Sequence, residues 1–210
     1  IVGVIQQVVE GARALHRRET LHQDLKPENI LVTTEARSDG SPVVKIIDYG
    51  SCRISGLAEL AAPFHRQEAL GTVDFSAPEY RLGTPASNQS DLFSIAAVAY
   101  YLLTGGQTPY GERWERAHTQ RDFFTLNYVP AFQHNPLVPA WMDGALKKSL
   151  SILPSSRHEC LSEFVQDLQK PNAHLTPGEA LPLITRNPTL FWKLLSATLF
   201  LALVLVLIFD

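Results

Sequence analysis

The sequence predicts a mainly α-helical body with one small β-hairpin, followed by a single C-terminal transmembrane helix. Apolar residues recur at intervals of three and four along several segments, which is typical of helices that bury one face. Two short runs rich in valine and isoleucine, with turn-forming residues between them, predict the hairpin. The end of the chain is an almost unbroken apolar run, which predicts the membrane helix.

The overall composition excludes several classes of protein. With 45% hydrophobic and 19% charged residues, the 210-residue chain is neither disordered nor collagen-like. A formal net charge of −3 argues against a nucleic-acid binder, which usually carries a basic excess. Two cysteines cannot form a disulfide framework, and we expect Cys52 and Cys160 to be free thiols in a reducing compartment.

Four helices are expected in the body. Residues 1–18 form an amphipathic pattern whose apolar stripe consists of Ile1, Ile5, Val8, Ala12 and Leu15. Residues 91–104 are nearly all apolar but, at about 1.5 Å per residue, are too short to cross a bilayer. They are therefore expected to form a helix buried in the core. Further helices are expected at 139–150 and 158–169.

The expected hairpin lies in the first third of the chain. Its strands are residues 30–34 and 43–47, joined by the connection EARSDGSP. Residues 48–79 show no sustained periodicity and are expected to form a long loop, which in a compact domain is usually functional or disordered.

The C-terminal part consists of a linker and the apolar segment. Residues 171–189 contain four prolines and are expected to have poor helical capacity. Residues 190–209 would span about 30 Å as a helix, with Trp192 and Lys193 at the membrane interface. The basic residues on the N-terminal side place the preceding domain in the cytoplasm. The alternative is a helix buried in the body, against which stand the preceding linker and the lack of a polar face.

Four short motifs indicate the chemistry. Residues 22–29 read HQDLKPEN, and they are followed by Asp48-Tyr49-Gly50, Gly71-Thr72 and Ala77-Pro78-Glu79. Taken alone, each motif is weak, and Asp24 by itself would be read as a turn residue. In this order, with strands between the first two, the set resembles the C-terminal lobe of a eukaryotic-like Ser/Thr protein kinase over about residues 1–170.

The resemblance implies three catalytic residues. Asp24 would accept or orient the proton of the substrate hydroxyl, and Lys26 would offer its ammonium group to the transferring phosphate. Lys26 also implies Ser/Thr rather than tyrosine substrates. Thr72 matches the position whose hydroxyl bridges the catalytic aspartate and lysine.

The resemblance also implies ATP and Mg²⁺ as cofactors and a protein as substrate. Asn29 and Asp48 would supply oxygen ligands to Mg²⁺, a hard cation, and would thereby hold the nucleotide. Gly50 would let the chain turn sharply after the metal ligand. The six histidines other than His22 show no metal-ligand spacing, so a zinc site is not expected.

Five further residues match structural positions of the family. Glu79 and Arg157 resemble an ion pair that ties the substrate-facing loop to the late helices. Asp91 resembles a carboxylate that caps the backbone of the catalytic loop. His22 and Tyr49 would stack in a hydrophobic spine.

The expected organisation is a kinase C-terminal lobe at 1–170, a linker at 171–189 and a transmembrane helix at 190–209. The Gly-rich loop and strand lysine of the family's N-terminal lobe do not occur in these residues. We therefore expect this fragment to be inactive alone, with catalysis in the parent protein.

The leading hypothesis is a membrane-anchored bacterial Ser/Thr kinase. The chain is similar to proteobacterial proteins that fuse a phosphatase domain upstream of the kinase, which implies a single-pass inner-membrane protein with a cytoplasmic kinase domain and a phosphatase domain in the same protein. One alternative is a pseudokinase that acts as a membrane-tethered interaction module, although the intact catalytic-type residues argue against it. Another is a small-molecule phosphotransferase, against which Ala77-Pro78-Glu79, Thr72 and Arg157 stand.

Overall fold

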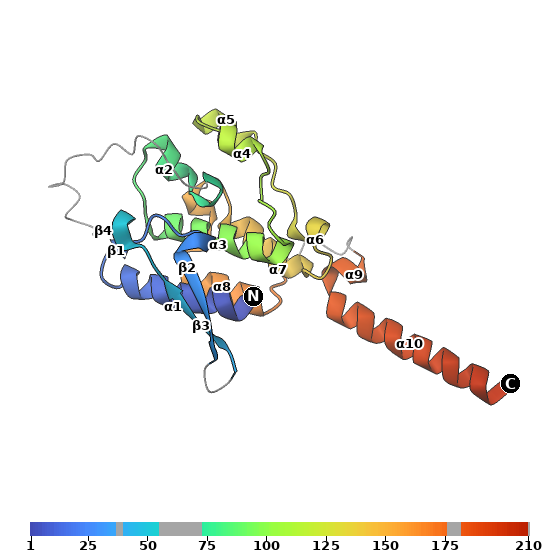
Figure 1. Ribbon diagram of the computed structural model, residues 1–210. Helices are drawn as coiled ribbons and strands as arrows, with labels where there is room; N and C mark the ends of the chain where they lie inside the picture. The colour runs from blue at the N-terminus through green and yellow to red at the C-terminus, as the bar shows by residue number, and fades with distance from the viewer. Residues whose placement is uncertain (37–39, 55–72, 176–181, 210) are drawn as a thin grey trace.

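Helix α3 (Asn88–Thr104) lies at the centre of the body and is buried along most of its length (Figure 1). The computed structural model describes residues 1–36, 40–54, 73–175 and 182–209. A capping box starts α3, because Ser87 Oγ accepts a hydrogen bond from the Gln89 N–H at 3.3 Å and Ser90 Oγ accepts one from the Ser87 N–H at 3.0 Å. The apolar run predicts a start at residue 91. The cap explains why the helix begins earlier, at Asn88.

Three other helices surround α3. They are α1 (Val2–His16), α7 (Ala140–Ser149) and α8 (Leu161–Gln169), and all three lie within one to three residues of the ranges that the periodicity predicts. Helices α1 and α7 pack against α3, and α8 packs against both α1 and α7. The buried face of α1 consists of Ile5, Val8, Val9 and Ala12. The prediction of a mainly helical body is therefore confirmed.

Two small antiparallel sheets accompany the helices. The predicted hairpin is confirmed as β2 (Ile30–Ala36) and β3 (Pro42–Ile46), with Ile30 opposite Ile46. A second sheet joins β1 (Thr20–Leu21) to β4 (Arg53–Ile54). Sequence patterns cannot detect it, because strands of two residues show no alternation and their partners lie far apart in the chain.

The expectation of one long loop over 48–79 is wrong for the part that the structure describes. This stretch contains the 3₁₀ helices η2 (Tyr49–Ser51) and η3 (Val73–Phe75), strand β4 and the start of helix α2 (Pro78–Leu82). Each element is too short to show periodicity. Local hydrogen bonds and tertiary contacts define them.

Three short helices between α3 and α7 also escaped prediction: α4 (Arg113–Arg116), α5 (Gln120–Phe124) and α6 (Ala131–His134). Aromatic packing holds this region to the body. The Trp114 ring lies 5.4 Å from the Phe93 ring, 5.0 Å from that of Tyr110 and 5.1 Å from that of Phe123, measured between centroids.

After α8, the chain contacts helix α7 again before it continues into the C-terminal helix. Gly144 in α7 lies so close to the backbone of Leu175 that a Cβ atom at 144 would collide with the Leu175 carbonyl oxygen. Helix α9 (Leu183–Arg186) then packs against α7, so the expected linker contains one short helix.

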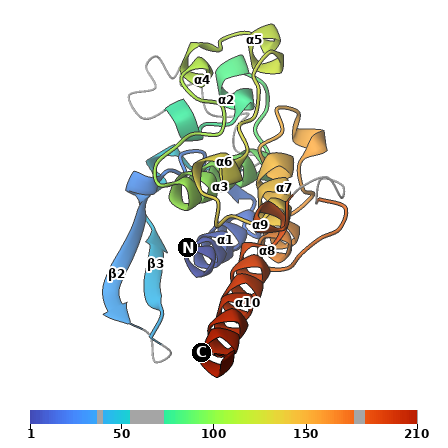
Figure 2. The same cartoon turned by 90° about the vertical axis from the view of Figure 1, so that its right-hand side faces the viewer.

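Helix α10 (Pro188–Phe209) follows α9 and projects away from the body (Figures 1 and 2). Its side chains are largely exposed, including Leu199, Phe200 and Leu201, each more than half exposed. Within the described residues it is the one helix long and apolar enough to cross a membrane. The alternative of a helix buried in the body is therefore wrong for this structure.

Replacing Gly144 with alanine tests the return of the chain to α7. The new methyl group would meet the Leu175 carbonyl, so we expect the free energy of unfolding to fall by about 1–3 kcal/mol, as in other overpacked sites. Urea denaturation measures the difference. Gly3→Ala is the matched control, because Gly3 also lies in a helix, α1, and a methyl group added there would meet no atom within 4 Å. Equal stability of the two variants would contradict the close contact.

Candidate active site

The loop of residues 22–29, which joins β1 to β2, is fastened to the first turn of α3. The Asp91 carboxylate is fully buried and accepts hydrogen bonds from the backbone N–H groups of His22 at 2.9 Å and Gln23 at 3.0 Å. The His16 ring lies with its Nε2 2.8 Å from Asp91 Oδ2. The carboxylate thus joins the end of α1, the loop and the central helix.

Within this loop, two side chains converge on the carboxylate of a third. Lys26 Nζ lies 3.0 Å from Asp24 Oδ2, and Asn29 Nδ2 donates to the same oxygen at 3.1 Å and to the Asp24 carbonyl at 2.8 Å. The Asp24 side chain is 28% exposed, so a hydroxyl group from outside can reach it. A fixed, accessible carboxylate beside an ammonium group can orient a hydroxyl and accept its proton.

Asn29 comes just before β2 and Asp48 shortly after β3, so the hairpin brings both residues to its same end. The Ile47 N–H donates to the Asn29 carbonyl at 2.9 Å, and Asp48 follows directly. Because Asn29 uses its Nδ2 toward Asp24, its amide oxygen Oδ1 is left for a cation. An amide oxygen and a carboxylate are ligands that suit Mg²⁺, which is usually bound by few protein groups and by substrate phosphates.

Backbone strain occurs on both sides of this site. Asp48 has a left-handed backbone with φ of 61°, and Gln23, directly before Asp24, has φ of 66°. Hydrogen bonds to carboxylates hold both conformations: Asp48 Oδ1 accepts from the Gly50 N–H at 3.2 Å, and Asp91 holds the Gln23 N–H. Residues strained in this way cluster at functional sites.

The His22 and Tyr49 rings touch, but they do not stack. Their centroids lie 5.6 Å apart with an interplanar angle of 58°, and Tyr49 is more than half exposed. The turn at Asp48 directs the Tyr49 hydroxyl toward the Ile46 carbonyl at 3.0 Å, which fixes the ring at this angle. The geometry therefore differs from the stacking that the sequence suggests.

Cys52 follows η2 and is a free thiol. Burial raises the pKa of this thiol, and the nearby Asp91 and Asp48 carboxylates raise it further. A thiol that stays protonated is a poor nucleophile, so no redox or nucleophilic chemistry is assigned to it.

A second constellation lies at α2. Arg157 and Glu79 form a bidentate ion pair with distances of 2.7 and 2.8 Å, and both side chains are buried. Ser90 Oγ donates to Glu79 Oε1 at 2.9 Å. The guanidinium group also lies 4.9 Å from the centroid of the Phe93 ring. Its remaining donors bind the carbonyl groups of Gln89, Ser151 and Ile152. The pair is fully hydrogen-bonded, as a buried ion pair requires.

The third expected catalytic residue, Thr72, lies outside the described residues, as does Gly71 before it. Among the residues that the structure describes, no three His, Cys, Asp or Glu side chains gather as a metal site.

Comparison with known proteins decides the family. A model of the protein kinase domain matches residues 1–172. The chain belongs to the protein kinase domain family. Similar kinases include serine/threonine-protein kinase Pkn1 of Myxococcus xanthus, 31% identical over 170 residues, which cover 80% of this chain and 24% of that protein. PknB of Mycobacterium leprae is 25% identical over 189 residues, covering 86% of this chain and 28% of that kinase.

The chain spans about a quarter of the length of these two kinases, 24% and 28%. Serine/threonine-protein kinase 17A of Oryctolagus cuniculus is also similar, with 33% identity over 127 residues, which cover 60% of this chain and 30% of that kinase. The described part of the kinase domain contains both constellations, at the 22–29 loop and at α2.

Two residues of the kinase domain were not predicted from the sequence. His16 touches Asp91, and Ser90 touches Glu79. His16 and Asp91 are 75 residues apart, and Ser90 and Glu79 are 11 residues apart, so no local sequence pattern identifies either contact. A serine three residues after Ser87 is nevertheless a recognisable capping signal.

Breaking the Glu79–Arg157 ion pair tests how much it contributes to the stability of the fold. In Arg157→Met the Glu79 carboxylate stays buried without its counter-charge, so we expect the free energy of unfolding to fall by about 3–5 kcal/mol. Thermal and urea denaturation measure the loss. Arg17→Met serves as the control, because this arginine is exposed, and its effect should stay within about 0.5 kcal/mol. An equally small effect at both positions would refute a stabilising role of the pair.

Proposed function

We propose that this chain contains the catalytic loop and metal-binding aspartate of a Ser/Thr protein kinase, which transfers the γ-phosphate of ATP to a protein hydroxyl group. The observation that supports it most directly is the group formed by Asp24, Lys26 and Asn29, with hydrogen bonds and an ion pair of 2.8–3.1 Å. Phosphoryl transfer needs a positioned hydroxyl and neutralised phosphate charge, and these residue types supply both.

Each residue of the site has a distinct task in this proposal. Asp24 orients the hydroxyl of the substrate and accepts its proton, while Lys26 places a positive charge next to the transferring phosphate. Asn29 Oδ1 and the Asp48 carboxylate hold Mg²⁺, and Gly50 permits the turn that aims Asp48. When bound, Mg²⁺ and ATP supply the phosphoryl group and the charge neutralisation.

The remaining predicted residues position the site. Asp91 holds the backbone at His22 and Gln23, so that Asp24 keeps its place. Glu79 and Arg157 hold the chain at α2, which follows the segment expected to face the substrate. Thr72 keeps its predicted role as the hydroxyl that bridges catalytic aspartate and lysine.

The buried Glu79–Arg157 pair also favours a protein kinase over a small-molecule phosphotransferase. It fixes α2 against the late helices, where a peptide-binding groove needs a rigid wall. A pseudokinase scaffold would have no use for the hydrogen-bonded grouping around Asp24. Both alternatives remain outcomes of the activity assay.

We further propose that α10 spans a bacterial inner membrane once, with the kinase domain in the cytoplasm. The support is the exposed apolar surface of this 22-residue helix, together with Trp192 and Lys193 near its start. A phosphatase domain in the same protein is proposed on sequence resemblance alone.

The activity is tested in the full-length protein with radiolabelled ATP and Mg²⁺. We expect Asp24→Asn to lower the rate of transfer at least about 100-fold, the usual loss for a catalytic base. Asp48→Ala should lower it as well and should also raise the Mg²⁺ concentration needed for half-maximal rate. Glu10→Gln, at an exposed position of α1, is the matched control and should retain activity. Equal transfer by the wild type and Asp48→Ala would overturn the proposed catalysis.

The membrane span is tested by extraction. We expect the protein in isolated membranes to resist alkaline carbonate and high salt and to dissolve only in detergent, because a spanning helix buries its apolar surface in hydrocarbon. A variant that ends at Arg186 should appear in the soluble fraction. Release of the intact protein by carbonate or salt alone would exclude the span.

A further inference from the structure

The helices and connections near the point where α10 leaves the body contain apolar side chains that are exposed or only partly buried. Helix α7 contacts both α6 and α9, and α9 contacts α10. Figures 1 and 2 show these helices side by side at the point where α10 leaves the body. We call Leu137, Trp141 and Leu183 the juxtamembrane corner; they lie in the α6–α7 connection, in the first turn of α7 and in α9.

Leu137 is held outward by its surroundings. Its side chain is 67% exposed, whereas the next residue, Val138, is buried in the core. The Leu137 N–H donates to Asn135 Oδ1 at 3.0 Å, and Asn135 Nδ2 donates to the Leu103 carbonyl at the end of α3 at 2.8 Å. An ordered turn therefore presents a large apolar side chain, which costs free energy in water unless something covers it.

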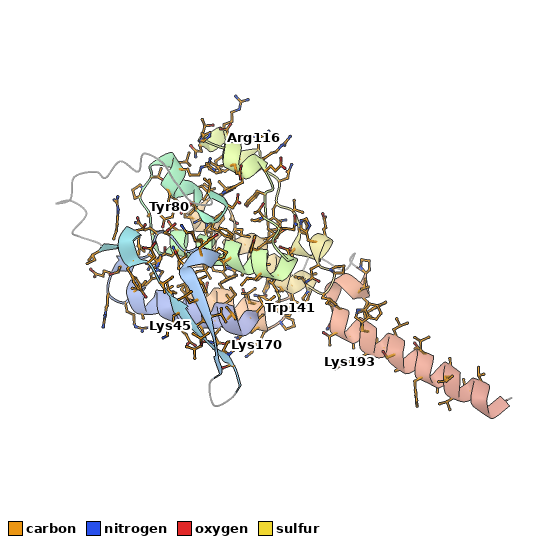
Figure 3. All side chains as sticks on the ribbon, viewed as in Figure 1. Lys45, Tyr80, Arg116, Trp141, Lys170 and Lys193 are labelled. Atoms are coloured by element: carbon orange, nitrogen blue, oxygen red, sulfur yellow. The ribbon has the colours of Figure 1, made fainter. Side chains whose placement is uncertain are left out.

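Trp141 and Leu183 extend the same apolar surface. Trp141 is only partly buried, and Figure 3 shows it near the start of α10. Leu183 is 39% exposed. A tryptophan with one face packed and one face open is typical of the interface between water and lipid.

The chain path ties this corner to the membrane helix. Leu175 rests on Gly144 of α7, and α9 touches α7 again a few residues later. Only Asn187 separates α9 from α10, and the two helices pack against each other. A bilayer that surrounds α10 must therefore have its headgroup layer next to α9, which packs against α7.

We propose that the juxtamembrane corner inserts into the headgroup layer of the bilayer that α10 spans, so that the kinase domain lies against the membrane in one orientation. This inference rests on the proposed membrane span. The partner is a lipid surface, because the corner leads directly into the helix that enters it. Leu137 and Leu183 lose contact with water there, and Trp141 reaches the depth that its ring prefers.

This orientation has a consequence for the active site. Helices α2 and α5 lie at the end of the body opposite α10 in both views (Figures 1 and 2). With the corner against the lipid, α2 faces away from the bilayer. Protein substrates in the aqueous phase can then approach without crossing the membrane surface.

Tryptophan fluorescence in nanodiscs tests the contact. The chain has three tryptophans, of which Trp114 is buried in the core. The protein is reconstituted in phosphatidylcholine nanodiscs with and without bromine near the headgroup end of the acyl chains, and each ring is isolated by difference against Trp141→Phe and Trp192→Phe. We expect the emission of Trp141 and of Trp192 to be largely lost in brominated lipid. Leu137→Ser should restore part of the Trp141 emission, whereas Phe124→Ser, on the exposed α5, should not.

The outcomes separate the two proposals. If Trp192 is quenched and Trp141 is not, the span stands and the docking of the corner is refuted. If neither ring is quenched, the membrane span itself fails and the corner with it. If Phe124→Ser restores Trp141 emission as much as Leu137→Ser does, the lobe lies on the lipid by another face, and the proposed orientation is wrong.

Discussion

The buried carboxylate of Asp91 is the constraint on which the proposed active site depends. A charge with no exposure to water is tolerated only when hydrogen bonds replace its hydration. Here two backbone N–H groups of the 22–29 loop and the His16 ring supply them. The loop cannot move away without leaving this charge unpaired in the core. Because Asp91 lies in the capped first turn of α3, the position of Asp24 is set by the most buried helix of the protein.

The same turn of α3 also controls the second constellation. Ser90, the neighbour of Asp91, donates to Glu79 Oε1, and Glu79 holds Arg157. Two adjacent residues thus fasten the loop around Asp24 and the chain at α2. A shift of this turn would displace the proposed catalytic group and the chain at α2 together, and the capping box at Ser87 holds the turn in place.

Whether an element could be predicted from the sequence depended on how far apart in the chain its interacting residues lie. Helices α1, α3, α7 and α8 and the β2–β3 hairpin could be predicted, because their apolar patterns are local properties of the chain. Strands β1 and β4 and helices α4–α6 could not, since they depend on partners distant in the chain, such as the aromatic cluster around Trp114. In the site, ordered motifs indicated Asp24, Asn29 and Asp48. The contact of His16 with Asp91 has no local signature and needed the structure.

The fold also joins the ion pair to the segment that precedes α10. His158, next to Arg157, is fully buried, with Nδ1 2.7 Å from Ser149 Oγ and Nε2 2.9 Å from Asp167 Oδ2. Burial lowers the pKa of this ring, and the hydrogen bond to Asp167 opposes part of that shift.

The other oxygen of Asp167 accepts a hydrogen bond from Asn172 Nδ2 at 3.0 Å, and three residues later Leu175 rests on Gly144. Helices α7 and α8 are thus connected on one side to Arg157 and on the other to the chain leading to α10. These hydrogen bonds are buried or partly buried and directional, so they resist small rotations of α7 against α8. The ion pair that holds α2 is for this reason linked to Leu175 through two helices of the body.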